Sequence, residues 1–161
     1  MANGLQNYIV KETADGTTVN TLVETITSSN LISANTVAVG DVLTLFARVK
    51  RITTTGTLFT FKVYFNTSSS LIGATLVATS TGSVVGVNLV DYGRIFIVKN
   101  ATNTQGFSNI LINQARYASF AGFSLTDSNI DWTVNQYLII SITLLSALEV
   151  AKSSGCLLLK D

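Results

Sequence analysis

Residues 41–50, DVLTLFARVK, carry an apolar side chain at every second position, namely Leu43, Leu45, Ala47 and Val49. Residues 58–65, LFTFKVYF, repeat this pattern with Phe59, Phe61, Val63 and Phe65. The side chains of a β-strand point alternately to its two faces, so a period of two residues indicates a strand with one buried face. The two stretches therefore predict two half-buried strands.

A short connection joins these two strands. It runs from Arg51 to Gly56 and ends in glycine, which is typical of the loop of an antiparallel hairpin. Pairing Val49 with Phe59 and Leu45 with Val63 puts every apolar side chain of the two strands on one face. The opposite face of the predicted hairpin then carries Arg48, Lys50, Thr60, Lys62 and Tyr64.

Further strand signals follow at intervals of about ten residues, and no stretch has a convincing helical period. These signals lie at residues 19–26, 74–79, 84–90, 94–99, 107–117, 132–145 and 155–160. Eight or nine short antiparallel strands indicate an all-β protein, a β-sandwich of the jelly-roll type. We expect this domain to span residues 19–161.

Charge is scarce in the chain. Only 12% of the 161 residues are charged and the net charge is +1, whereas 22 Thr, 16 Ser and 13 Asn supply most of the polar side chains. The low content of charged residues excludes a disordered polyelectrolyte, and the small net charge offers no basic surface for nucleic acid. The apolar stretches are also far shorter than the about 20 residues that span a bilayer, so we expect no nucleic-acid partner and no membrane insertion.

The residues needed for several kinds of catalysis are missing. The chain has no His, which excludes Ser-His-Asp and Cys-His catalysis and any zinc site with a His ligand. The single cysteine, Cys156, lies in an apolar run and is expected to be a buried small hydrophobe. Asp127, Asn129 and Asp131 resemble the start of a calcium loop but lack its glycine and distal Glu. We therefore expect a protein that is not an enzyme and needs no metal or cofactor.

One long apolar run points to self-association. Residues 137–145, YLIISITLL, are apolar on both faces of the predicted strand. A strand with two apolar faces is covered on both sides, and in a two-layer sandwich the second cover comes from another subunit. We expect a homotrimer whose interface contains Tyr137, Ile139, Ile140, Ile142 and Leu144. The alternative is a central strand with Ser141 and Thr143 facing outward.

Two other surfaces are candidates for binding a partner. Arg48, Lys50, Arg51 and Lys62 form a basic cluster if the hairpin is correct, suited to phosphate, an acidic glycan or an acidic protein surface. The simpler interpretation is a solvated sheet face. Aromatic side chains near strand ends suit sugar binding, although they equally suit packing at the ends of the sandwich; they are Tyr92, Tyr117 and Trp132.

The first 18 residues form a separate region in this interpretation. Tyr8, Ile9 and Val10 make one short apolar patch, and a flexible turn follows at residues 14–18. Such a patch is too small to fold alone but suits adding a strand to the sheet edge of a partner. We expect residues 1–18 to be an attachment arm. The alternative is that residues 5–10 are the first strand of the sandwich and continue into the strand at Val19 through a hairpin.

Four segments carry a resemblance to a known group of proteins; they are residues 35–45, 61–79, 94–99 and 130–140. Together they resemble the small jelly-roll domains, similar to tumour necrosis factor, of tailed-bacteriophage virion proteins such as fibre tips, head fibres and capsid-decorating proteins. The resemblance covers residues 19–161 and rests on structural motifs, among them Gly40-Asp41 at a strand entry, so no ligand-binding residue is carried over.

The resemblance implies a non-enzymatic virion structural protein, a trimer bound to other virion proteins. The short segment before the first strand cannot form a shaft, which favours direct attachment to the capsid, neck or tail. The alternative is a receptor- or carbohydrate-binding module of a tail fibre or adhesin, with a host-surface glycan as its partner.

Overall fold

The computed structural model describes residues 7–53, 59–82, 89–107 and 125–161. These residues form ten β-strands and no helix, so the described part of the chain holds no helix that could cross a membrane. Every strand pairs with its neighbours in the antiparallel sense. The all-β prediction is confirmed.

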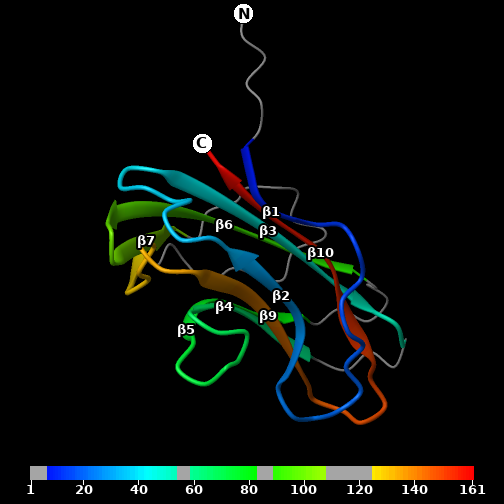
Figure 1. The fold of residues 1–161 in the computed structure, drawn as a ribbon. Helices are drawn as coiled ribbons and strands as arrows, with labels where there is room; N and C mark the ends of the chain where they lie inside the picture. Colours follow the sequence, from blue (N-terminus) through cyan, green and yellow to red (C-terminus); the bar gives the residue numbers. More distant parts are fainter. Residues whose placement is uncertain (1–6, 54–58, 83–88, 108–124) are drawn as a thin grey trace, which may run out of the picture.

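The strands form two layers that pack face to face (Figure 1). The six-stranded sheet has the spatial order β1 (Asn7–Glu12), β10 (Ala151–Lys160), β3 (Val42–Arg51), β6 (Leu89–Asn100), β7 (Asn103–Phe107) and β8 (Leu125–Ser128). The four-stranded sheet has the order β2 (Thr25–Ile32), β9 (Gln136–Leu144), β4 (Phe59–Asn66) and β5 (Thr75–Gly82). The predicted sandwich is therefore confirmed.

The predicted hairpin of residues 41–50 and 58–65 is wrong. β3 pairs with β10 and β6, whereas β4 pairs with β9 and β5 in the other sheet. The alternation shows which side of each strand is buried, but it does not show which strand lies beside it. The two apolar faces meet across the core instead of lying side by side in one sheet.

The buried faces themselves are as predicted. The four apolar side chains of β3 are at most 3% exposed, and those of β4 are at most 1% exposed. Aromatic rings join the layers at one end of the core, where the ring centroid of Phe65 lies 5.2 Å from Trp132 and 6.2 Å from Phe96, both edge to face. The core therefore draws on both sheets.

The turn that leads into β3 also agrees with the sequence analysis. Gly40 has a φ of 91°, a left-handed conformation that favours glycine. The Asp41 carboxylate accepts a hydrogen bond from the Ala38 backbone N–H at 2.6 Å and lies 2.7 Å from the Lys160 ammonium group. Gly40 and Asp41 thus shape the turn into β3, at the strand entry where the sequence places this motif.

We expect Ile142→Asp to prevent folding. Ile142 is fully buried in the core, and a carboxylate there has no partner, which costs several kcal/mol of stability. Thr143→Ser, at the next position of β9, should fold and melt close to the parent chain. Far-ultraviolet circular dichroism during heating measures both. A folded Ile142→Asp chain with a smaller assembly would instead place Ile142 at a subunit interface.

Candidate functional site

The predicted interface on β9 divides between the two faces of the strand. Ile140, Ile142 and Leu144 point inward and belong to the hydrophobic core. Tyr137 and Ile139 point to the outer face of the four-stranded sheet, where Ile139 is fully buried within the single chain. The first three are therefore not available to a second subunit. That the chain self-associates stays a prediction.

The predicted basic cluster does not form. Arg48 and Lys50 are exposed on the outer side of β3, whereas Lys62 lies on the outer side of β4 in the opposite sheet. The cluster depended on the hairpin, so the placement of β3 and β4 in different sheets separates its members. Arg51 is not on the surface at all, because it is only 3% exposed.

Arg51 takes part in a buried ion pair. Its Nε lies 3.3 Å from a Glu149 carboxylate oxygen, and its guanidinium group lies 5.5 Å from the centre of the Phe59 ring. The Thr53 hydroxyl donates to the same Glu149 oxygen at 2.9 Å and accepts from the Val150 backbone N–H at 2.9 Å. These contacts fasten the segment after β3 to the loop between β9 and β10.

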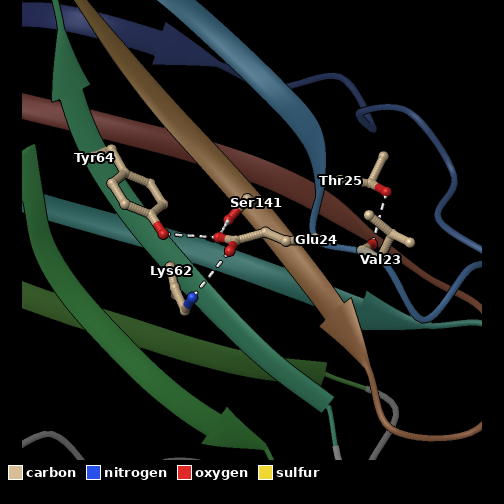
Figure 2. A network of polar contacts seen from close by, with 6 residues as sticks. All are labelled: Val23, Glu24, Thr25, Lys62, Tyr64 and Ser141. Carbon is tan, nitrogen blue, oxygen red and sulfur yellow. Dashed lines mark hydrogen bonds and ion pairs between the residues drawn. The ribbon is translucent and has the colours of Figure 1, made fainter. Parts of the chain in front are cut away.

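A second polar group, which the sequence analysis did not identify, surrounds Glu24 (Figure 2). Its Oε1 accepts hydrogen bonds from the Ser141 hydroxyl at 2.6 Å and the Tyr64 hydroxyl at 2.7 Å, and its Oε2 lies 3.0 Å from the Lys62 Nζ. We call these four residues the Glu24 cluster. It joins the segment before β2 to β9 and β4 on the outer face of the four-stranded sheet.

The charges of the Glu24 cluster support one another. Burial raises the pKa of Glu24, but the hydrogen bonds from Ser141, Tyr64 and Lys62 outweigh it, so the pKa lies below the usual value of a glutamate. The hydrogen bond to Glu24 in turn raises the pKa of Lys62. At neutral pH the cluster is therefore an ion pair that braces the sheet rather than a proton donor or acceptor.

The amino-terminal segment lies inside the fold. Residues 7–12 form β1 and pair with β10 at the edge of the six-stranded sheet, where Val10 is 5% exposed and Ile9 packs against the core. This placement corrects the expectation of an arm outside the sandwich and favours the alternative of a first strand. That strand pairs with β10 rather than with the Val19 segment, and the pairing places Val10 in the hydrophobic core. Tyr8 is 40% exposed; residues 1–6 lie outside the described residues, and attachment through this segment stays a prediction.

The candidates for sugar and calcium binding have other partners. Trp132 is 3% exposed and donates from its indole Nε1 to the Thr104 hydroxyl at 2.8 Å, so it packs the end of the sandwich. Asp131 accepts from the backbone and hydroxyl of Thr133, and Asp127 lies 3.5 Å from Lys99. Within the described ranges, no group of three His, Cys, Asp or Glu residues lies close enough together to hold a metal ion. The Tyr92 side chain and all of Tyr117 lie outside the description.

The outer side of the six-stranded sheet carries an apolar surface. Ladder pairs place Thr44 between Leu159 and Ile95, and place Leu157 beside Phe46. We call the half-buried apolar residues that point outward here the outer apolar face; they are Val42, Phe46, Ile95, Ile97, Leu157 and Leu159. The sequence indicates this outer apolar face through β6 and β10, because both strands, like β9, have apolar residues on both faces.

Comparisons with protein-family models, with curated proteins and with solved structures find no match to this chain.

Glu24→Gln should lower stability at neutral pH and flatten its dependence on acid. The pKa of Glu24 is lowered on folding, so its contribution is present above the unfolded value of 4.5 and is lost as the pH falls through the folded value. We expect urea unfolding to show a loss of about 1 kcal/mol for the variant near pH 7 and a progressively smaller loss as the pH falls below 4.5. An equal loss above and below pH 4.5 would contradict the ion pair.

Cys156 should resist thiol reagents in the native protein. It is 1% exposed, and burial raises the pKa of its thiol to about 12, so almost no thiolate is present near pH 8. Ellman's reagent should label the chain only after denaturation. Rapid labelling of the folded chain would show that the core around β10 opens, since Cys156 is one of its buried residues.

Proposed function

We propose that the sandwich is a jelly roll. Setting aside β7 and β8, the strand pairs are nested: β1 with β10, β2 with β9, β3 with β6, and β4 with β5. Nested antiparallel pairs are what a long hairpin gives when it is rolled into two layers, and the jelly roll is that arrangement. β7 and β8 then extend one layer beyond β6.

We propose further that the chain is a non-enzymatic structural protein of a virion. The nested strand pairing is the observation that carries this proposal, because jelly rolls are a common architecture of viral capsid domains. The resemblance of the four sequence segments to small phage virion domains adds to it. In this proposal the protein attaches directly to the capsid, neck or tail.

The proposed assembly is a homotrimer that forms through the outer apolar face. Apolar side chains that line three neighbouring strands, β10, β3 and β6, with no charged side chain between them, favour contact with another protein surface. Tyr137 and Ile139 on the other sheet are a weaker candidate, because the Glu24 cluster with its ion pair lies beside them. The outer apolar face replaces the interface that the sequence analysis expected on β9.

Light scattering of the purified chain tests the assembly. We expect a mass three times the 17.2 kDa of one chain, and we expect Ile95→Lys with Leu157→Lys to reduce it, because buried unpaired ammonium groups oppose association. Leu76→Lys, on the outer side of the four-stranded sheet, is the matched control and should keep the parent mass. A parent chain that stays monomeric at micromolar concentration would refute the trimer.

Immunogold labelling of purified particles tests the attachment. Antibodies against the chain should decorate particles made by cells that carry its gene, at the shell, neck or tail. Absence from the particles, together with binding of the chain to a glycan array, would favour the alternative of a receptor- or carbohydrate-binding module.

A further inference from the structure

The amino-terminal strand extends the outer apolar face beyond β10 (Figure 1). The ladder pairs Tyr8 with Leu159 and Lys11 with Leu157, so both β1 residues lie on the outer side of the six-stranded sheet. Tyr8 and Lys11 are three positions apart, and they share a side because the register shifts between Tyr8 and Val10. The outer apolar face therefore continues over four neighbouring strands, β1, β10, β3 and β6.

The Tyr8 ring is held on this surface. It is 40% exposed, and the Lys11 ammonium group lies 5.2 Å from the ring centre, which is a cation–π contact. Tyrosine brings a large contact area at a low cost in conformational entropy, and it is enriched among the residues that dominate protein interfaces. A held, partly exposed tyrosine that continues an apolar surface therefore suits the role of an interface anchor.

The two margins of the six-stranded sheet differ. On the β8 side, the ladder runs from Ile97 to Gln105 and on to Asp127. Asp127 lies 3.5 Å from Lys99, and these two side chains are 52% and 43% exposed. This solvated ion pair ends the apolar surface at β8, whereas Tyr8 continues it onto β1. The β1 margin is therefore the one that suits contact with another protein surface.

A ring of three copies needs two different contact surfaces on each copy. A two-fold contact joins one patch to the same patch of its neighbour, but around a three-fold axis each copy presents one surface to the next copy and another to the previous copy. The outer apolar face has two such parts in the proposed trimer. Its β1 side carries Tyr8 and Leu159, and its β6 side carries Ile95 and Ile97.

We infer that the β1 side of one copy packs on the β6 side of the next copy, with Tyr8 as the anchor. The inference rests on the proposed homotrimer and specifies how its copies meet. Ile95 and Ile97 are apolar and half-buried in the single chain, so they offer the surface against which the Tyr8 ring and Leu159 can be buried. The partner of the β1 side is therefore a second copy of this chain.

A change at Tyr8 tests the anchor. Tyr8→Ala should raise the concentration at which the assembly dissociates by about tenfold or more, measured by light scattering over a dilution series. Tyr8→Phe keeps the ring and should assemble like the parent chain. The matched control is Leu31→Ala, on the outer side of the four-stranded sheet and 51% exposed, which should leave the assembly unchanged. Circular dichroism confirms that each variant folds.

Cross-linking tests which surfaces meet. A chain with Lys11→Cys and Ile97→Cys, treated with a bismaleimide, should give covalent trimers on a denaturing gel. Each single-cysteine variant should give none, because the ring sets position 11 of one copy against the β6 side of the next rather than against another position 11. The native Cys156 is buried and should not react.

The outcomes separate this inference from the proposed trimer. A trimeric parent that is unaffected by Tyr8→Ala, or whose double-cysteine variant yields no covalent trimers, overturns the inference and leaves the trimer in place. Covalent dimers from a single-cysteine variant would show a two-fold contact and overturn both. A monomeric parent also overturns both. Weaker assembly of Tyr8→Ala together with covalent trimers of the double-cysteine variant is the expected result.

Discussion

The burial of two alternating apolar faces against each other is the constraint on which this structure depends. The inward side chains of β3 and β4 are almost wholly removed from water, and each such side chain contributes about 1.5–3 kcal/mol relative to an exposed one. In this fold β3 and β4 lie in opposite sheets, and their apolar faces meet across the core. The connections that follow must therefore cross between the layers, and that crossing produces the nested order of strands.

The sequence predicted the buried sides of β3 and β4 well and their pairing poorly, and the reason is physical. The predicted strand at residues 19–26 is displaced to 25–32, and most of the one predicted at 107–117 lies outside the described residues. Alternation is a local property, so residues 43–49 and 59–65 revealed their buried sides directly. Pairing is decided by segments far along the chain: β3 lies beside β10, about a hundred residues away. The apolar run on β9 was misread for a related reason, since Ile140 and Ile142 are core residues and Ile139 is covered within its own chain. The same double-sided pattern on β6 and β10 marks the surface that the proposed trimer uses.

The polar clusters could not be found from spacing, because their members come from distant strands. Glu24 meets Ser141 across 117 positions, and Arg51 meets Glu149 across nearly as many. A buried ion pair contributes little net stability, because removing both charges from water offsets their attraction. The Arg51–Glu149 pair instead serves to position a loop. It joins the loop between β9 and β10, which contains Glu149, to the end of β3.

This use of charge explains how a sparsely charged chain can present apolar surfaces. The sequence has ten basic and nine acidic residues, and at least five ion pairs join described residues to one another. Charged residues are few and these pairs engage ten of them, so neutral threonine, serine and asparagine supply most of the polar side chains. A surface of neutral polar and apolar groups can meet a partner without stripping water from ions, which is the costly step in burying a charged surface. Pairing within the chain therefore leaves the outer apolar face suited to contact.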